Sequence, residues 1–553
     1  MYGNMMQMPL LISALLRHAD SYHGDTAIVS RLGPGQVHRY TYRDAHRRAR
    51  QLANVLGSLG IARSSRVGTL AWNTHRHFEL YFAISGMGAI INTVNPRLFP
   101  EQIEYIINHA DDEIILFDAA FLPLVEKIAG RCPGVKSWIV LADADKAPES
   151  ALELLTYESL LDGRSDRFEW PEFDENIASS LCYTSGTTGN PKGVLYSHRS
   201  TLLHTLGICL PDGLHLSARE VMMPVTPMFH VFSWGLPYAA CLVGAKLVLP
   251  GAKLVLPGAQ LDGASLYDLF EKERVTFTSG VPTVWLGLLQ YLQSNELMLS
   301  TLKRVVIGGS ACPPAMFDQF AERGIEVIHA WGMTETSPFA TSNHAKAKHL
   351  ALPEGEQRKL RTKQGRPGFG VELKIVDGDG HELPRDGVAF GDLLVRGHWV
   401  TAQYFKAEGG GNLRDGWFPT GDVATLDEDG FVQITDRSKD VIKSGGEWIS
   451  SIDIENFAIA HPAVAEAAVI GVAHPKWAER PLLVVVRKPG QDVDREQMLE
   501  FLRDKIAKWW LPDDVVFVDS LPHTATGKLS KLILRQQLKD YRWPEAVSRS
   551  TRS

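Results

Sequence analysis

Short β-rich runs alternate with helical patterns along most of the chain, and this alternation constrains the fold more than any other feature. The runs "SRVGTLAWN" and "EIILFD" predict buried strands, and "FELYFAISGMGAI" between them predicts a helix. Further strands are predicted in "SWIVLAD", "RVVIGGS", "EVIHAWG" and "VELKIVD". Strands that alternate with helices indicate an α/β architecture with largely parallel sheets.

A second unit begins after about Asp436. The chain has 553 residues, which is too many for one hydrophobic core. The pattern restarts with the strands "AVAEAAVIGVAH" and "RPLLVVVRKPG", a helix through "REQMLEFLRDKIAKW" and the strand "DDVVFVDSLP". We therefore predict a large multi-sheet N-terminal domain over 1–436 and a small α+β C-terminal domain over 437–553.

Composition excludes several classes of function. A net charge of −7 gives no electrostatic reason to expect nucleic acid binding. The five cysteines are dispersed without a Cys-x-x-Cys pair, which predicts reduced thiols in the cytoplasm and neither a disulfide framework nor a zinc site. The start lacks the basic region of a signal peptide, and its leucines predict a packed first helix. No apolar run approaches the roughly 20 residues that span a bilayer.

The heptapeptide "GAKLVLP" occurs twice in succession, at Gly244–Pro250 and Gly251–Pro257. Two copies do not make a repeat fold, which needs at least three stacked units. Pro250 cannot donate a backbone hydrogen bond, so one strand through both copies is disfavoured. We expect one copy to form a strand and the other to form a surface loop.

The most informative loop is "CYTSGTTGNPKGVLYSHRS", which follows a predicted strand at Ala178–Tyr183. Glycines allow backbone N–H groups to approach an anion, hydroxyl groups add donors, and Lys192 adds a positive charge. Gly193 follows the lysine where a Walker loop would have Ser or Thr. We favour a phosphate-binding loop over a plain linker, with these residues in contact with phosphate: Thr184, Ser185, Gly186, Thr187, Thr188, Gly189 and Lys192.

Four further motifs accompany this loop. They are "HAWGMTET" with Glu335, "DGWFPTGDVA" with Asp422, "DRSKDVIKSGGEWIS" with Arg437, and "LPHTATGKLSK" with Lys528. Together they resemble the adenylate-forming superfamily of acyl-CoA synthetases, firefly luciferase and peptide-synthetase adenylation domains, over nearly the whole chain. The segments "PMFHVFSWGLPYAACLVGAKLVLPG" and "NPRLFPEQIEYIINHADD" are most similar to bacterial medium- and long-chain fatty acyl-CoA synthetases and methylmercaptopropionyl-CoA ligases.

The resemblance implies a reaction in two halves. A carboxylic acid attacks the α-phosphate of ATP and releases pyrophosphate, and the thiol of coenzyme A then attacks the acyl-adenylate. The acid is expected to be a short- to medium-chain fatty acid, with methylmercaptopropionate or an aryl acid as the alternative. Mg²⁺ prefers hard oxygen ligands, for which the resemblance indicates Thr184 and Glu335. A homodimer is possible.

The resemblance also assigns roles to residues. Lys528, Glu335 and His230 are the expected catalytic residues. Trp331 is expected to stack on adenine, at a position where tyrosine is commoner in the family, and Asp422 and Arg437 to bind the ribose. The remaining nucleotide contacts are Gly309, Ser310, Ala311, His329, Ala330, Gly332, Met333 and Thr334. The expected acyl-pocket walls are His230, Phe232, Trp234, Gly235, Val281, Pro282, Trp285 and Gly308.

A lysine that serves adenylation obstructs thiol attack, so in this family the small domain rotates between the two steps. The resemblance places the hinge at Lys439, where a few backbone angles can absorb such a motion. After rotation, the segment facing coenzyme A would contain Lys443, Gly445, Gly446, Glu447 and Trp448.

The sequence leaves several alternatives to an acyl-CoA synthetase to be weighed. A peptide-synthetase module is disfavoured because we see no carrier-protein domain after Lys528, but an oxidative, luciferase-like role stays open. A non-catalytic nucleotide-binding protein is disfavoured by the presence of all the charged motif residues. A dinucleotide oxidoreductase has only "GRPGFG" in its favour, which lacks the preceding strand and following acid of that fingerprint.

Overall fold

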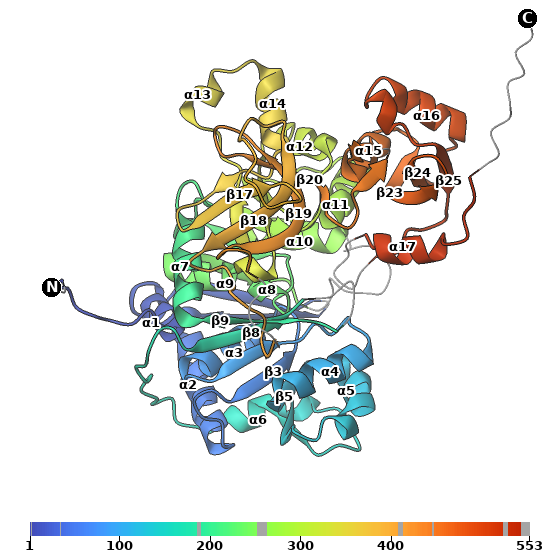
Figure 1. Cartoon of the computed structure of the whole chain (residues 1–553). Coiled ribbons are helices and arrows are strands. Elements are labelled where there is room, and N and C mark those ends of the chain that lie inside the picture. The colour runs from blue at the N-terminus through green and yellow to red at the C-terminus, as the bar shows by residue number, and fades with distance from the viewer. Residues whose placement is uncertain are drawn as a thin grey trace, which may run out of the picture.

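The computed structural model describes residues 1, 3–33, 35–184, 190–251, 263–407, 413–444, 447–523 and 529–543. The expected phosphate contacts at 185–189, the glycines at 445 and 446, Lys528 and residues 252–257 of the second heptapeptide copy lie outside these residues. The described chain is a mixed α/β structure with a large multi-sheet N-terminal domain and a smaller C-terminal domain, as predicted (Figure 1).

A seven-stranded sheet contains the first predicted strands. All its neighbouring strands pair in parallel except β8 and β9, which form an antiparallel hairpin. Its order is β7 (Leu154–Thr156), β6 (Ser137–Val140), β5 (Asp112–Phe117), β3 (Arg66–Leu70), β4 (Ile90–Thr93), β8 (Ala178–Tyr183) and β9 (Gly193–Ser197). The strand predicted before the glycine-rich loop is confirmed as β8.

A nine-stranded sheet follows, parallel at its centre and antiparallel at both edges. Its order is β16 (Arg366–Pro367), β15 (Phe339–Ser342), β14 (Glu326–Gly332), β13 (Arg304–Ile307), β12 (Phe277–Gly280), β10 (Val221–Pro224), β11 (Lys246–Leu249), β1 (Ala27–Gly33) and β2 (Gln36–Thr41). The first heptapeptide copy forms β11, which pairs with both β1 and β10.

Helices form a layer between these two sheets. One buried cluster joins Val67 and Ile114 of the first sheet to Met222 and Val306 of the second. The helices in this layer are α1 (Ile12–His23), α2 (Tyr42–Ser58), α3 (His75–Gly86), α7 (His198–Cys209) and α9 (Leu236–Val243). Both sheets are therefore covered on this side, which accounts for continuous apolar runs such as Val305–Ile307 of β13.

Other helices cover the outer faces. α4 (Pro100–Ala110) and α5 (Leu122–Ile128) cover the seven-stranded sheet, while α10 (Gly263–Glu273), α11 (Pro282–Ser294) and α12 (Pro314–Ala321) cover the nine-stranded sheet. The shorter helices are α6 (Tyr157–Leu161), α8 (Val231–Trp234), α13 (Ala347–Leu350) and α14 (Glu354–Thr362). Among the described helices, none combines the length and apolar character needed to cross a membrane.

Two further sheets lie towards the C-terminus. The first is antiparallel: β17 (Val371–Val376), β18 (Phe390–Gly397), β19 (Phe418–Leu426) and β20 (Val432–Arg437). The second has the order β22 (Glu447–Ile449), β21 (Ile442–Ser444), β24 (Ala478–Arg487) and β23 (Val464–His474), with β25 (Asp514–Phe517) beside β24. Three helices accompany it: α15 (Ser451–Ile459), α16 (Arg495–Arg503) and α17 (Lys531–Gln537).

The helix predicted through Trp509 is too long. α16 ends at Arg503. Beyond this end Trp509 contacts Arg480 of β24, whose guanidinium lies 4.7 Å from the ring centroid of Trp509 and donates a 2.9 Å hydrogen bond to the Trp509 carbonyl oxygen. These contacts hold Trp509 against the sheet and outside the helix.

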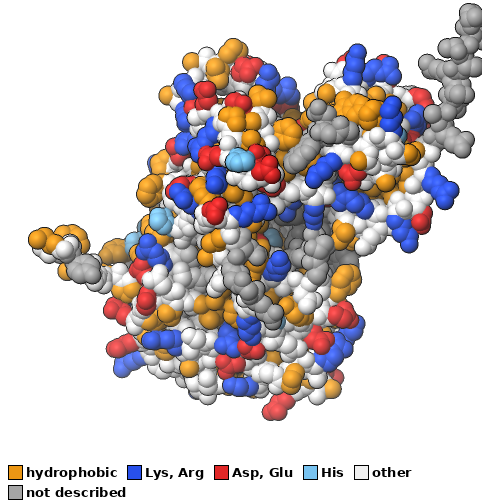
Figure 2. All heavy atoms as spheres, viewed as in Figure 1, with side chains coloured by type: hydrophobic (Ala, Val, Ile, Leu, Met, Phe, Trp, Pro, Cys, Tyr) orange, Lys and Arg blue, Asp and Glu red, His pale blue; other side chains and the backbone are white. Residues whose placement is uncertain are grey.

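Charged side chains of both signs are mixed over the visible face of the molecule. In Figure 2 lysine and arginine alternate with aspartate and glutamate across both domains, and the described part of this face carries no extended basic stripe.

Asp112, the first residue of β5, is a buried carboxyl with incomplete hydrogen bonding. Its Oδ2 accepts a 2.7 Å hydrogen bond from Asn92 on β4, and its Oδ1 has no partner among the described residues. Burial raises the pKa of Asp112 well above its usual value, and the Asn92 bond and the charge of Arg66 offset this only in part. Ionisation of this group therefore opposes folding.

We expect Asp112→Asn to stabilise the protein, and to do so more at pH 8 than at pH 5. An acid whose pKa is raised by folding ionises first in the unfolded chain. The free energy of unfolding therefore falls as the pH rises from about 4, the unfolded pKa, towards the folded pKa. The amide does not titrate, so the variant should gain about 1–3 kcal/mol at pH 8.

The midpoint of urea unfolding at the two pH values measures this effect. Asp166→Asn is the matched control, because Asp166 is exposed and distant in the chain from Asp112. An equal gain at both pH values would contradict the assignment of the penalty to ionisation.

Candidate active site

The glycine-rich loop is closed at its base by two residues that face each other. The backbone N–H of Thr184 donates to the carbonyl oxygen of Lys192 at 2.9 Å, and the N–H of Lys192 lies 3.4 Å from Thr184 Oγ1. The antiparallel pairing of β8 with β9 begins at the next residue pair, Tyr183 with Gly193, and holds Thr184 and Lys192 together. The Thr184 hydroxyl and the Lys192 ammonium group therefore belong to residues that face each other at the end of the β8–β9 hairpin.

Glu335 lies beyond the end of β14, in a short 3-10 turn at Thr334–Thr336. Its carboxylate is buried, with 5% of the residue exposed, and Oε1 accepts a 2.6 Å hydrogen bond from the hydroxyl of Tyr404. Burial raises the pKa of Glu335, while the Tyr404 bond and the charge of Arg437 act in the opposite direction. A buried carboxylate with a raised pKa is stabilised by a nearby cation.

Tyr404 connects this carboxylate to the glycine-rich loop. The ammonium nitrogen of Lys192 lies 4.9 Å from the centroid of the Tyr404 ring, within the range of a cation–π contact. Sequence reasoning missed Tyr404, because "TAQYFKAE" contains no pattern that indicates a chemical role. Only the fold brings this segment against β9 and Glu335.

Asp422 is held by two of the residues expected to bind the nucleotide with it. Trp331 on β14 donates its indole N–H to Oδ2 at 2.9 Å, and Arg437 pairs with Oδ1 at 2.8 Å. The register of β19 with β20 places Asp422 directly opposite Arg437. A tyrosine at the Trp331 position would have no indole N–H to donate. The three side chains therefore form one preorganised group.

The strand ends next to this group carry the other expected nucleotide contacts. β13 and β14 are parallel neighbours, so the residues that follow them emerge at the same edge of the sheet. His329 points away from this edge, because its Nδ1 donates to the carbonyl oxygen of Thr362 at 2.9 Å. Burial lowers the pKa of His329 to about 4, so the ring is neutral near pH 7. The remaining residues at this edge are Gly309, Ser310, Ala311, Ala330, Gly332, Met333 and Thr334.

The segment after His230 makes a left-handed turn that the sequence did not predict. Positive φ angles of 45°, 51°, 52°, 59° and 79° occur in succession at Val231, Phe232, Ser233, Trp234 and Gly235. A left-handed residue other than glycine costs about 1–2 kcal/mol, so surrounding contacts must hold the turn.

Three kinds of contact hold this turn. The N–H of Val231 lies 3.4 Å from Cys182 Sγ, and Ser233 Oγ donates to the carbonyl oxygen of Thr226 at 2.7 Å. The Phe232 ring packs against the rings of three buried tyrosines, Tyr81, Tyr196 and Tyr238. The turn is thereby fixed to β8, to the end of β10 and to the helical layer.

The turn brings part of the expected acyl pocket together. Trp234 packs edge-on against Phe339, with ring centroids 5.9 Å apart. A Cβ atom at Gly308 would lie 3.6 Å from the Trp234 ring and only 2.8 Å from the carbonyl oxygen of Ala330, so this position requires glycine. At Gly235 a Cβ would lie 2.8 Å from the ring of His204. Phe339 and His204 are neighbours that sequence reasoning missed.

The structure does not bring Trp285 to this pocket. Trp285 is buried in the cluster that contains Val305 and Ile307, whereas Trp234 belongs to the cluster that contains Val306. Alternate residues of a strand point to opposite faces of the sheet. The two tryptophans therefore lie on opposite faces, and the expectation that both are pocket walls is corrected. Val281 packs against both clusters, at the start of α11.

Two contacts flank Lys439, the predicted hinge. On one side Asp436 accepts hydrogen bonds from the N–H and the hydroxyl of Ser451, at 2.8 and 2.5 Å. On the other side Asp440 pairs with Arg535 of α17 at 2.6 Å. The first contact joins β20 of the four-stranded sheet to α15 of the C-terminal domain, and the second lies within the C-terminal domain. Of the residues expected to face coenzyme A, Lys443 donates its backbone N–H to Glu479 at 3.1 Å.

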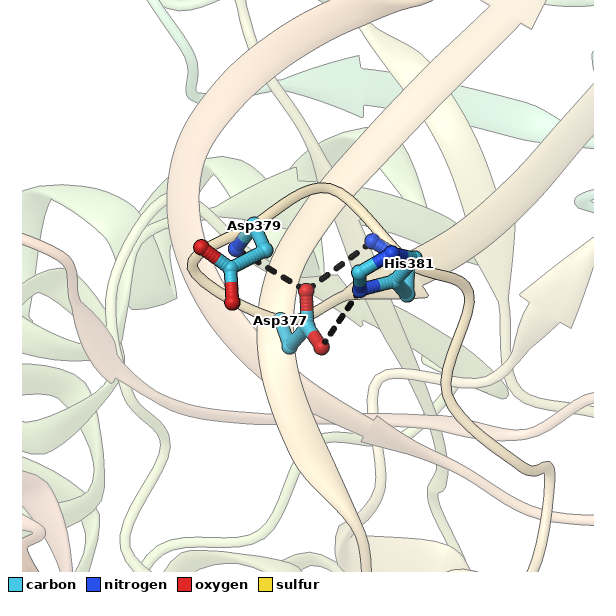
Figure 3. A group of neighbouring side chains, drawn as sticks. All are labelled: Asp377, Asp379 and His381. Atoms are coloured by element: carbon cyan, nitrogen blue, oxygen red, sulfur yellow. Dashed lines mark hydrogen bonds and ion pairs between the residues drawn. The ribbon is translucent and has the colours of Figure 1, made fainter.

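A separate group of carboxylate and imidazole side chains lies on the β17–β18 connection (Figure 3). Asp377 Oδ1 accepts 2.9 Å hydrogen bonds from the backbone N–H groups of Asp379 and His381, and its other oxygen lies 3.3 Å from the His381 ring. These bonds lower the pKa of Asp377. The group is explained as a hydrogen-bonded turn, and it is not part of the site around Glu335.

Comparison with known proteins gives matches over almost the whole chain. The AMP-binding enzyme family matches residues 15–405, and the AMP-binding enzyme C-terminal domain matches 453–528. The 3-methylmercaptopropionyl-CoA ligase of Ruegeria lacuscaerulensis is 54% identical over 98% of this chain and 99% of its own. The medium-chain fatty acid–CoA ligase of Ectopseudomonas oleovorans is 50% identical over 98% of both chains. The crystal structure of an anthranilate CoA ligase in complex with anthranoyl-AMP superposes with a TM-score of 0.84 at 27% identity, covering 98% and 99%.

We expect Asp422→Asn to raise the KM for ATP by 10- to 100-fold and to leave the KM for the acid within twofold. The amide replaces one of the two acceptor oxygens with a donor and removes the negative charge, and a hydrogen bond to a charged group contributes about 1.5–3 kcal/mol. Initial rates at varied ATP and acid concentrations measure the effect. Asp392→Asn on the neighbouring strand is the control, and a change confined to the acid KM would contradict this placement of the ribose.

Proposed function

Since the chain belongs to the AMP-binding enzyme family, we propose that the site around Glu335, Asp422 and the Thr184–Lys192 loop is where it adenylates a carboxylic acid. The chain is an AMP-forming acid–thiol ligase, which uses ATP and coenzyme A to convert an acid into its acyl-CoA. The observation that carries the proposal is the convergence of Lys192, Glu335, Asp422 and Arg437 at one edge of the sheets.

Each charged group has a role in the proposed adenylation. Lys192 and the glycine-rich loop hold the β- and γ-phosphates, while Asp422 accepts from the ribose hydroxyls beside Trp331. Arg437 contacts the sugar or a phosphate. Lys528 is proposed to approach the α-phosphate as the acid attacks. Cationic groups placed beside the negative charge that develops in the transition state usually make the largest single contribution to catalysis at such a site.

Magnesium fits the residues present. Glu335 offers a buried carboxylate oxygen and Thr184 offers a hydroxyl, which are the hard ligands that Mg²⁺ takes. Burial raises the pKa of Glu335, and a divalent cation would restore the stability of its anion. When bound, Mg²⁺ would neutralise charge on the phosphates of ATP.

A short- to medium-chain fatty acid is our proposed substrate. Trp234 and Phe339 close the pocket beside Gly308, and this bulk favours shorter acyl groups. The similarity to the Ectopseudomonas enzyme supports a medium-chain acid. The similarity to the Ruegeria enzyme supports 3-methylmercaptopropionate as the alternative, and an aryl acid remains a second alternative. His230, at the start of the turn, is proposed to orient the carboxylate.

The transfer to coenzyme A is proposed to follow a rotation of the C-terminal domain, residues 437–553, about Lys439. The segment containing Lys443, Gly445, Gly446, Glu447 and Trp448 would then face the site. We also propose a cytoplasmic location, because ATP and coenzyme A are available there and the described cysteines are free thiols. A homodimer remains a prediction that light scattering coupled to size-exclusion chromatography can check.

A coupled assay of pyrophosphate release tests the function. The acids are saturated C3 to C14 acids, 3-methylmercaptopropionate and benzoate, each measured with and without coenzyme A. We expect turnover to require coenzyme A and the largest kcat/KM to fall on a C4 to C10 acid. A maximum on 3-methylmercaptopropionate would favour the alternative, and the same turnover without coenzyme A would contradict the ligase assignment.

We expect Trp234→Ala to raise kcat/KM for C12 relative to C6 by at least 10-fold. Removal of the indole opens the pocket against Phe339, and each methylene that gains contact contributes about 1 kcal/mol or more. The ratio of the two kcat/KM values is the measurement.

Trp285→Phe provides the matched control for this prediction, because Trp285 is buried on the opposite face of the same sheet. It should lower stability without changing the chain-length profile. An unchanged profile in Trp234→Ala would remove Trp234 from the acyl pocket.

A further inference from the structure

A segment that we call the strap, residues 398–407, crosses the site after β18. Its first half is fastened to the loop around Glu335 by three hydrogen bonds. Ser337 donates its hydroxyl to the carbonyl oxygen of Trp399 at 2.7 Å, and the Trp399 indole donates to the carbonyl oxygen of Phe339 at 2.9 Å. The N–H of Thr401 donates to the carbonyl oxygen of Glu335 at 2.8 Å.

The second half of the strap is fastened to the glycine-rich hairpin and to the first sheet. The N–H of Phe405 donates to the carbonyl oxygen of Gly193, the residue after Lys192, at 2.8 Å. Lys406 donates to the Asp111 carboxylate at 2.7 Å and to the His109 carbonyl oxygen at 2.8 Å. The strap therefore sets the position of the loop lysine relative to Glu335.

Tyr404 lies in the strap between these two sets of hydrogen bonds, and it contacts both the Glu335 carboxylate and the Lys192 ammonium group. Its hydroxyl donates to Glu335 Oε1 at 2.6 Å, and its ring lies 4.9 Å from the Lys192 ammonium nitrogen. A donor on one carboxylate oxygen fixes the rotation of the group and leaves the other oxygen for a cation. The negative face of the ring attracts the ammonium group.

We propose that Tyr404 is a positioning residue, which aligns the Glu335 carboxylate with the Lys192 ammonium group so that Mg²⁺ and the phosphates of ATP meet both together. The proposal rests on the proposed role of Glu335 as a magnesium ligand. A group that orients a metal ligand typically changes metal affinity 10- to 100-fold when it is removed. Tyr404 would act through Glu335 and Lys192, without touching the reacting atoms.

Two substitutions distinguish the contribution of the Tyr404 hydroxyl from that of its ring. Tyr404→Phe removes the donor to Glu335 and keeps the ring under Lys192. We expect it to raise the Mg²⁺ concentration needed for half-maximal ATP binding by about 10-fold. Tyr404→Leu removes both contacts, and we expect it to weaken ATP binding further, even at saturating Mg²⁺.

Calorimetric titration of ATP at a series of Mg²⁺ concentrations, without acid or coenzyme A, measures binding in the absence of turnover. Tyr196→Phe is the matched control. Tyr196 is buried, and it donates its hydroxyl, at 2.6 Å, to the backbone carbonyl oxygen of Thr334 beside Glu335. It should change thermal stability but leave the Mg²⁺ dependence within twofold.

The Mg²⁺ dependence of ATP binding to Glu335→Gln shows whether a negative result concerns Tyr404 alone or also Glu335 as a magnesium ligand. If Glu335→Gln leaves the Mg²⁺ dependence unchanged, Glu335 is not a ligand and both proposals are overturned. If Glu335→Gln raises the Mg²⁺ requirement but Tyr404→Phe does not, only the role of Tyr404 is overturned. A fall in thermal stability of Tyr404→Phe at unchanged Mg²⁺ dependence also overturns it, because the bond would then be structural.

Discussion

Buried carboxylates held by donors from distant parts of the chain organise the site. Asp422 on β19 receives an indole N–H from β14 and a guanidinium from β20, and Glu335 receives a hydroxyl from the strap. A buried carboxylate without such donors would protonate or destabilise the fold. The nine-stranded sheet, the four-stranded sheet and the strap are therefore coupled through these groups, and the proposed nucleotide site lies where the three meet.

The left-handed turn after His230 shows how packing supports an unfavourable backbone. Four residues other than glycine adopt positive φ angles in succession, which no local preference of Val231, Phe232, Ser233 or Trp234 supports. The contacts with Cys182, Thr226 and three buried tyrosines offset this cost. Strain of this kind concentrates at functional sites, and here it directs Trp234 towards Gly308 and Phe339.

The connection between the two domains is polar, whereas the left-handed turn is held largely by apolar packing. Across the predicted boundary Asp436 of β20 accepts hydrogen bonds from Ser451, and beyond Lys439 the ion pair of Asp440 with Arg535 lies within the C-terminal domain. The apolar clusters of the two domains are separate, because the two clusters of the C-terminal domain contain only residues from Ile442 onwards among those described. Because polar contacts are readily exchanged for water or for other partners, this arrangement is compatible with the proposed rotation of the small domain.

The sequence by itself determined the α/β class, most strand positions and the identity of the charged groups. Periodicity identifies buried strands because it reports local geometry, and the motifs indicate the proposed chemistry because phosphate, ribose and magnesium each need particular side chains. The end of α16, the left-handed turn, the separation of Trp285 from Trp234 and the position of Tyr404 were decided only by the tertiary structure. Each depends on contacts between residues far apart in the chain, as when Arg480 holds Trp509 or the strap reaches Gly193. No local pattern in the sequence encodes such contacts, because they form only when the sheets and the strap pack together.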